Sequence, residues 1–552
     1  MQLVDDSIIV SATDLVGFLA CDHLATLELE ALHGELPRPL RNDPELELIR
    51  KRGFEHERAY LERLRAEGRS VHEIAAPEAH TPDELEAAQD ETRAAMRSGA
   101  DVIFQATFFD GRWRGHADFL IRAERASDLG AWSYDIADTK LARRVKAAAI
   151  LQMCVYADLL TPLQGLPPET LSVVTGDGLA HPHRLAEYAA YYRAAKARFE
   201  ARIFGTGGPA PPTYPDPVEH CRVCTWWPVC IDRRRADDHL SMVAGMTRGA
   251  TRKLTNAGLP TLTALSTSLP DVRVPELAGR TLDRFRDQAR LQADFTRTGR
   301  LSYELVTPPD DDPGKGLAAL PEPSPMDLFF DMESDPWAIE DGLEYLFGVV
   351  EEVDGQPAYR ALWAHDRDEE KKAFEAFIDL AMERLERDPS MHIYHYAPYE
   401  PTALKRLMGR HATREDELDR LLRAGVLVDL YQVVRQGVRA SVESYSIKQI
   451  EKFYMPEREG PITSAGFSVI EYERWLESED RTVLDALEAY NRDDCVSTWR
   501  LRAWLEDRRL EAAPLYGGAP PPRPLPVGGE PPEDLARAQA ETRAREDALR
   551  EG

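Results

Sequence analysis

MDLFFDMES, residues 326–334, decides the fold of the C-terminal half of the chain. Its apolar residues follow a stretch rich in proline and glycine, which predicts a buried β-strand. Side chains alternate between the two faces of a strand, so Asp331 and Glu333 lie on the same face. The sequence therefore predicts an α/β domain whose first strand carries two carboxylates into one site.

Three downstream segments supply further groups for this site. Glu400 ends YHYAPYE, Asp429 lies in VDLYQVVRQ, and Tyr490 and Asp494 lie one turn apart on the amphipathic helix YNRDDCVSTWRLRAWL. This order resembles the DEDD exonucleases of the RNase H-like fold, in their tyrosine-containing variant. The resemblance implies two divalent metal ions, which clamp the attacking and leaving oxygens of a phosphodiester.

The same resemblance assigns a role to each residue. Asp331, Glu333, Glu400 and Asp494 would be metal ligands, and Tyr490 would orient the attacking water. Glu400 departs from the family, which usually has aspartate there, and its side chain is one methylene longer. Asp429 is an alternative ligand, although VDL also suits the end of a core strand. A retained but inactive RNase H-like scaffold is the second interpretation of this half.

A second group of motifs lies upstream, where helical and strand-like stretches alternate. In chain order these are GFEHE on a long helix, GHAD and DTK on two strands, and QMCVY on the following helix. Two carboxylates and a neutral imidazole make a hard site that suits Mg²⁺ or Mn²⁺, and a lysine beside them can stabilise developing negative charge. The residues concerned are His56, Asp118, Asp138, Lys140, Gln152 and Tyr156.

That order resembles the RecB-type branch of the PD-(D/E)XK nucleases. The resemblance implies that His56, Asp118 and Asp138 are metal ligands, with the backbone carbonyl of Thr139 as a further one. It makes Lys140 catalytic. Gln152 and Tyr156, at positions i and i+4 of one helix face, would line the path of the DNA.

Four cysteines extend this resemblance. Cys21 precedes the motifs, and Cys221, Cys224 and Cys230 follow them in HCRVCTWWPVC. One distant cysteine and a C-x2-C-x5-C group look like the iron–sulphur nucleases of the AddB and CRISPR-associated kind. The implied [4Fe–4S] cluster needs four thiolates. Structural zinc is the alternative, but zinc sites usually pair two close dicysteine knuckles.

Composition bounds the remaining interpretation. The net charge of −28 excludes a general nucleic-acid coat protein, which would be basic, and indicates that DNA is captured locally or delivered by a partner. The N-terminus has no signal-peptide pattern and no stretch approaches the length of a membrane helix, so we expect a cytoplasmic protein without membrane contact. The short segment TRKLTNAGLPTLTALS (251–266) has the cadence of a helix-hairpin-helix, with a plain helical spacer as the alternative.

These observations predict an α/β, multidomain chain: a PD-(D/E)XK nuclease fold with an iron–sulphur staple, a helical middle region and an RNase H-like α/β domain. The expected boundaries are a nuclease domain at 1–238, a helical region at 239–305, a linker at 306–325, the RNase H-like domain at 326–510, and a Pro-rich linker with a charged tail at 511–552.

The predicted activity is metal-dependent cleavage of DNA, at single strands or ends, in repair, recombination or defence. The predicted enzyme is a deoxyribonuclease of the exonuclease type, with a [4Fe–4S] cluster and Mg²⁺ or Mn²⁺ as cofactors. Two other hypotheses remain open. One is an RNA-processing exonuclease that acts through the RNase H-like domain, and the other is a non-catalytic module that binds DNA ends. Relatives of this combination often continue into a DNA helicase. This chain shows no Walker A sequence, so any helicase motor is expected to be a separate partner or a missing portion.

Overall fold

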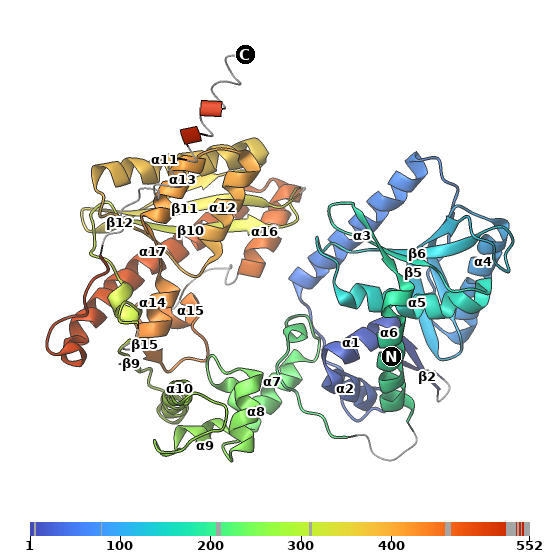
Figure 1. Cartoon of the computed structure of the whole chain (residues 1–552), viewed down its shortest axis with the longest axis horizontal. Helices are drawn as coiled ribbons and strands as arrows, with labels where there is room; N and C mark the ends of the chain where they lie inside the picture. The colour runs from blue at the N-terminus through green and yellow to red at the C-terminus, as the bar shows by residue number, and fades with distance from the viewer. Residues whose placement is uncertain are drawn as a thin grey trace. The chain divides into compact units, whose positions relative to one another are not determined.

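The computed structural model describes residues 1–4, 7–78, 80–205, 211–308, 312–339, 341–456, 458 and 465–525, with 537, 540, 541, 544 and 545. The chain divides into two compact units, Met1–Asp237 and Asp238–Gly552 (Figure 1). Residues 309–311 of the expected linker and most of the expected tail lie outside the described residues. No described helix combines the length and the apolarity that crossing a membrane requires.

The first unit is built on a mixed sheet. Its described strands follow the order β1-β2-β5-β6-β7-β8, and β4 pairs with both β5 and β3. Long strand β5 is the hub, because it pairs with β2, β4 and β6. The strands are β1 (Gln2–Val4), β2 (Ser7–Ser11), β3 (Val71–Glu73), β4 (Val102–Phe109), β5 (Trp113–Ala123), β6 (Ser133–Thr139), β7 (Thr170–Val174) and β8 (Ala180–Arg184).

Helices cover both faces of this sheet. Leu61 and Leu64 of α3 pack on Phe119 of β5, whereas the apolar residues of α5 belong to the main core with α1, α4 and α6. The α5 helix also links β6 to its parallel neighbour β7. The helices are α1 (Ala12–Ala20), α2 (Asp22–Leu32), α3 (Pro44–Ala66), α4 (Pro82–Ser98), α5 (Ala147–Gln164), α6 (Leu185–Phe204), η1 (Glu219–Arg222) and α7 (Trp227–Ala236).

The second unit begins with a small helical region that has its own apolar core. It follows the predicted helical character of residues 239–305, except that β9 (Tyr303–Leu305) pairs with the distant β15 (Val438–Ala440). Gly258, in the left-handed conformation, separates α8 from α9. The helices of this region are η2 (Leu240–Met242), α8 (Arg248–Asn256), α9 (Leu262–Ser266) and α10 (Gly279–Thr298).

The remainder of this unit is a mixed sheet of order β12-β11-β10-β13-β14. The strand predicted at 326–334 is its central strand β10, antiparallel to β11 and parallel to β13. Helices α11, α12 and α13 pack on one face and α14 and α17 on the other. The strands are β10 (Leu328–Asp335), β11 (Leu343–Val353), β12 (Gln356–Trp363), β13 (Ile393–His395) and β14 (Leu427–Asp429).

The helices of this sheet region are α11 (Arg367–Arg387), α12 (Tyr399–His411), α13 (Glu415–Arg423), α14 (Leu430–Gly437), α15 (Ile447–Ile450), η4 (Glu451–Phe453), α16 (Ala465–Ser478), α17 (Arg481–Glu511) and η5 (Ala513–Tyr516).

Part of the segment expected to be a linker is packed rather than free. Leu317, in the short helix η3 (Gly316–Ala319), and Leu320 are fully buried in the core that α14 and α17 share. Proline and glycine content suggested a linker, but the two leucines have an apolar surface to cover.

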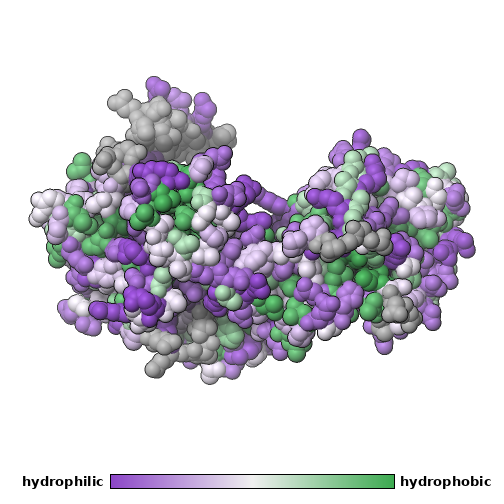
Figure 2. Space-filling view, turned by 90° about the horizontal axis from the view of Figure 1, so that it is seen from below, coloured by the Kyte–Doolittle hydropathy of each residue, from purple (hydrophilic) through white to green (hydrophobic). Residues whose placement is uncertain are grey.

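The face of the molecule drawn in Figure 2 is mostly hydrophilic, with hydrophobic residues in smaller patches.

Candidate functional site

Three carboxylates of the second unit lie close together. Asp331 and Glu333 project from β10 and Asp494 from α17, and one oxygen of each lies within 4.8 Å of the other two. Among the residues that the structure describes, no other set of three histidine, cysteine or acidic side chains meets this spacing. The alternation of β10 placed the first two residues correctly, and the sheet brings the distant Asp494 to them.

Close packing of α17 on the sheet makes this meeting possible. Gly348 lies opposite Asp331 on β11, and a Cβ atom there would come within 1.6 Å of the Asn491 Oδ1. Asn491 is fully buried; its amide donates to Asp331 Oδ2 at 2.8 Å and its Oδ1 accepts from Tyr359 at 2.9 Å. Asn491 is therefore a positioning residue, and no motif in the sequence marks it.

We expect Gly348→Ala to reduce the activity of this site strongly, because the methyl group must displace Asn491 and α17 with it. A shift of about 1 Å in a catalytic group can cost about a hundredfold in rate. The measurement is kcat of nucleic-acid cleavage together with the melting temperature. Gly409→Ala is the matched control, since nothing lies within 4 Å of a Cβ added there. Equal activity of the two variants would contradict the positioning argument.

The electrostatics of the cluster favour a bound cation. Burial, and then the charge of Asp494, raise the pKa of Glu333 to about 8. The same two causes raise the pKa of Asp331 well above its usual value. Carboxylates held together at such a cost are what a divalent metal site needs, because the ion removes their mutual repulsion. The donor set thus fits Mg²⁺ or Mn²⁺.

Basic and hydroxyl groups that the sequence analysis missed surround these carboxylates. Ser468 donates to Glu333 at 2.7 Å, Arg458 forms an ion pair with Asp494 at 2.7 Å, and Lys448 donates to the Tyr490 hydroxyl at 2.7 Å. Burial, and then Asp494, raise the pKa of Tyr490. No motif marks these residues, because Lys448 lies on the four-residue helix α15, Arg458 on irregular backbone and Ser468 at the start of α16.

Glu400 lies beside the cluster but outside the tight set. It begins α12, is almost fully buried, and has one oxygen 3.4 Å from His395 Nδ1. Its charge contributes to the raised pKa of Asp331. The proposed substitute, Asp429, caps α14 and accepts from the backbone N–H of Ala397 and Tyr431, both at 2.9 Å. Asp429 thus has a structural role, and Glu400 remains the candidate for the middle position.

In the first unit, β5 and β6 bring the predicted acidic residues together. Asp118 accepts hydrogen bonds from the backbone N–H and the hydroxyl of Thr139, both at 2.8 Å. Asp138 is fully buried and forms an ion pair with Lys140. One oxygen of Asp138 has no hydrogen-bond partner among the described residues. Burial, followed by the charge of Asp118, raises the pKa of Asp138 to about 7.

The helix α3 brings a residue to this site that the sequence analysis overlooked. His56 has its Nε2 3.4 Å from the Val174 carbonyl oxygen. Its neighbour Glu57 is buried against the site, accepts from Gln105, and has its pKa raised to about 7 by burial and by Asp118. The same GFEHE motif contained this signal, since adjacent helix residues point about 100° apart and only one can face the strands squarely.

Gln152 and Tyr156 lie on α5 at the same site. The Gln152 amide donates to the Tyr156 hydroxyl at 2.6 Å. Burial, and then Asp138, raise the pKa of Tyr156 well above its usual value. The glycine of the GHAD motif is explained here, because a Cβ on Gly115 would come within 2.7 Å of the Tyr156 ring. Tyr156 is buried and packs along one side of the site, whereas the sequence analysis expected it to line the path of the DNA.

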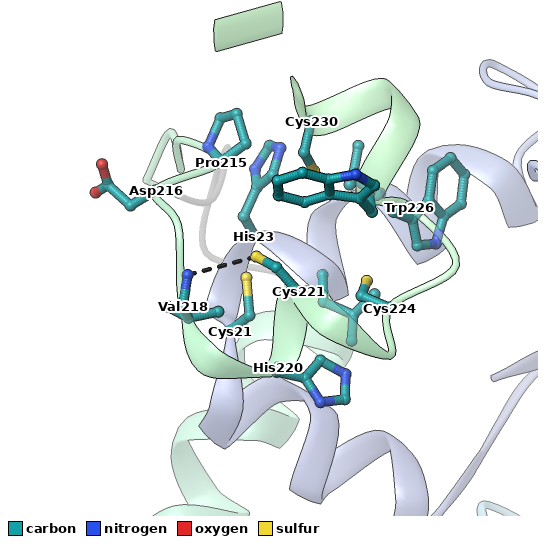
Figure 3. Close-up of a pocket in the computed structure, with 13 residues that line it drawn as sticks. Cys21, His23, Pro215, Asp216, Val218, His220, Cys221, Cys224, Trp226 and Cys230 are labelled. Atoms are coloured by element: carbon teal, nitrogen blue, oxygen red, sulfur yellow. Dashed lines mark hydrogen bonds between the residues drawn. The ribbon is translucent and has the colours of Figure 1, made fainter. Parts of the chain in front are cut away.

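The four predicted cysteines line one pocket of the first unit, although Cys21 is far from the others in sequence (Figure 3). Cys21 lies at the junction of α1 and α2, and Cys221, Cys224 and Cys230 lie on η1, the following turn and α7. Burial, and then the neighbouring thiols Cys224 and Cys21, raise the pKa of Cys230 to about 11. None of the four forms a disulfide.

Polar contacts brace the cysteine loop against the N-terminal segment. The Arg41 guanidinium donates to the carbonyl oxygens of Cys224 at 2.8 Å and Arg222 at 2.7 Å. The Trp226 indole donates to Glu28 at 2.8 Å. Arg234 is buried, and its Nε donates to the Cys230 carbonyl. This side chain therefore supports the cysteine loop.

Comparison with known proteins identifies part of this architecture. Residues 328–506 match the family model of the RNase_H superfamily. A comparison of the whole chain with curated proteins found no match. The matched range contains the carboxylate cluster and every strand of its sheet. It identifies an RNase H-like domain and indicates a nuclease that cleaves phosphodiester bonds.

Proposed function

We propose that the chain is a metal-dependent nuclease that cleaves DNA at single strands or ends, with two separate catalytic centres. The observation that carries this proposal is the cluster of Asp331, Glu333 and Asp494, within 4.8 Å of one another on an RNase H-like domain. Such a set of hard oxygen ligands binds Mg²⁺ or Mn²⁺, which would activate a water and screen the phosphate. Tyr490, anchored by Lys448, orients the attacking water.

The first centre is proposed to be of the RecB-like PD-(D/E)XK kind. Asp118 and Asp138, from neighbouring strands, would hold the metal ion, with His56 as the third ligand and Glu57 beside them. The partnerless oxygen of buried Asp138 supports this assignment, because burying an unpaired carboxylate oxygen is costly. Lys140 holds the other oxygen and its side chain is about a third exposed, so it is also available to a substrate phosphate.

The cysteine pocket is proposed to hold a [4Fe–4S] cluster. One distant cysteine, Cys21, and a C-x2-C-x5-C group line this pocket. Structural zinc sites usually pair two close dicysteine knuckles, so this ligand pattern supports the cluster over structural zinc.

The test of the proposed function is a time course with end-labelled DNA and RNA of the same sequence, with Mn²⁺, Mg²⁺ or EDTA. Faster loss of the DNA label with either metal is the expected result. Preferential cleavage of RNA, lost in Asp331→Ala but not in Asp118→Ala, would favour an RNA-processing enzyme. Binding of DNA ends without cleavage under any metal would favour a non-catalytic module.

The close packing of these carboxylates predicts a trade-off: it lowers the stability of the metal-free protein and allows the site to bind a metal ion. We expect Asp331→Asn to raise the melting temperature of the metal-free protein, because it removes a buried charge that repels Glu333 and Asp494. A gain of about 1 kcal/mol corresponds to about 2–4 °C for a domain of this size. Added Mn²⁺ should stabilise the wild type and not the variant. Asp429→Asn, which alters a helix cap instead, is the control, and an equal response to Mn²⁺ in the wild type and Asp331→Asn would contradict the assignment.

A further inference from the structure

An aromatic pocket lies on the RNase H-like domain beside the carboxylate cluster. Its volume is about 530 Å³, within the range of about 300–1,000 Å³ typical of small-molecule sites. Trp363 at the end of β12, His365 after it, and Trp475 on α16 line it, and all three are partly exposed. The catalytic assignments above make no use of this pocket.

The aromatic side chains that line the pocket pack against one another and against a second layer of rings. The His365 ring lies 4.3 Å from Trp475 and 5.5 Å from Trp363, measured between centroids. Behind them, Tyr472 bonds to His365 Nδ1 at 3.1 Å and stacks on Tyr345 at 3.8 Å. Flat side chains fixed in this way lose little entropy when a flat ligand binds.

Three structural routes place the pocket about 10 Å from the carboxylates. Trp363 is opposite Leu346, which is opposite Glu333, so two strand spacings of about 4.8 Å separate them. On α16, Trp475 follows Ser468, the partner of Glu333, by two turns, or about 10 Å. On α17, Glu488 precedes Asp494 by six residues, or about 9 Å. A strand with a stacked rise of about 3.4 Å spans this distance in about three nucleotides.

The charge of the rim selects the part of a nucleotide that can enter. Glu479, Asp485 and Glu488 face one cation, Arg481, so the negative rim disfavours a phosphate. Carboxylates accept hydrogen bonds from exocyclic amino groups such as N4 of cytosine. Aromatic faces stack with any base.

We propose that this pocket binds one unpaired nucleobase of the substrate, about three nucleotides from the scissile phosphate, and prefers cytosine to thymine. The inference rests on the proposed nuclease function and adds the substrate class: a single-stranded segment with a splayed-out base. A cationic side chain of a partner protein is the competing occupant. Proximity to the carboxylates, of which Asp494 shares helix α17 with the pocket, favours the base.

The main experiment moves a single abasic site along a single-stranded oligonucleotide and measures its affinity and cleavage with Mn²⁺. We expect about a tenfold loss of affinity at one position about three nucleotides from the cut, and little loss elsewhere. Trp475→Ala should show the same loss on the intact oligonucleotide and no further loss on the abasic one. Trp475→Phe should restore most of the affinity. Trp499→Ala, which removes a half-buried tryptophan elsewhere on α17, is the control. An equal affinity with the abasic site at every position would overturn the inference.

A second measurement separates this inference from the proposed function. Free cytidine should quench tryptophan fluorescence more strongly than thymidine in the wild type, and Trp475→Phe should reduce the effect. If the chain cleaves no nucleic acid, the nuclease proposal fails, and this titration alone then shows whether the pocket binds a nucleobase. Quenching by arginine amide but not by cytidine overturns the base assignment in favour of a cationic partner.

Discussion

Alanine in place of Lys140 is expected to lower the rate of DNA cleavage at least about a hundredfold, the usual cost of removing one group that stabilises transition-state charge. Lys140 forms the ion pair of the buried Asp138, so its loss also leaves a carboxylate uncompensated beside the proposed metal. Asp118→Ala should have an effect of at least that size, because it removes a proposed metal ligand and the anchor of Thr139. The measurement is single-turnover cleavage of end-labelled DNA with Mn²⁺.

The control for this pair is Arg144→Ala, which removes an exposed cation from the same segment. It should leave the rate within about twofold, since exposed charges act weakly in salt. In the Lys140→Ala protein, slow metal-dependent trimming should persist and then vanish when Asp331 is also changed to Ala. Wild-type cleavage by Asp118→Ala would remove the first centre from the proposal, whereas complete loss of trimming in Lys140→Ala would remove the second.

Serine in place of Cys21 is expected to abolish binding of the proposed iron–sulphur cluster and to destabilise the first unit by several kcal/mol, because structural metal binding is folding free energy. The cross-link would close a loop of about 200 residues, where the entropic benefit is large in principle. Anaerobic protein should be brown and contain iron with little zinc. Cys224→Ser should behave like Cys21→Ser, with both losing colour, iron and melting temperature together.

The matched control is Cys154→Ala, which changes a buried cysteine of α5 outside the cysteine pocket. It should lower the melting temperature through the cavity it leaves yet keep the full iron content. Stoichiometric zinc without iron in the wild type would replace the cluster by a zinc site. An unchanged metal content in Cys21→Ser would remove the N-terminal cysteine from the ligand set.

Period-two alternation was sufficient to predict where the main acids lie. It placed Asp331 and Glu333 on one face of β10, and Asp118 opposite the DTK strand, because strand geometry is local. The sheet pairings then bring each set together, and the helix carrying Asp494 follows from its own pattern. These parts of both candidate sites depend on residue spacing that is visible in one dimension.

The supporting groups could not be predicted in the same way. Asn491 matters only because Gly348 lets α17 approach β11, a contact between residues far apart in sequence. Lys448 reaches the site from the four-residue helix α15, which is too short to show a periodic pattern, and Arg458 from irregular backbone. Glu57 was overlooked for a different reason: the helix pattern fixed the face only to within one residue. Packing, rather than pattern, decides such positions.

Helix α17 spans Arg481–Glu511 in 31 residues without a break, and this continuity constrains how the protein can change during evolution. Asp485 of the aromatic pocket, Asn491 against the sheet, and Asp494 at the carboxylate cluster all lie on this one helix. Each residue advances a helix by about 100°. A single insertion or deletion between Asp485 and Asp494 would turn the pocket out of line with the cluster, whereas substitutions on the solvent side leave the alignment intact. We therefore expect relatives to keep the length of this segment constant while its exposed residues vary.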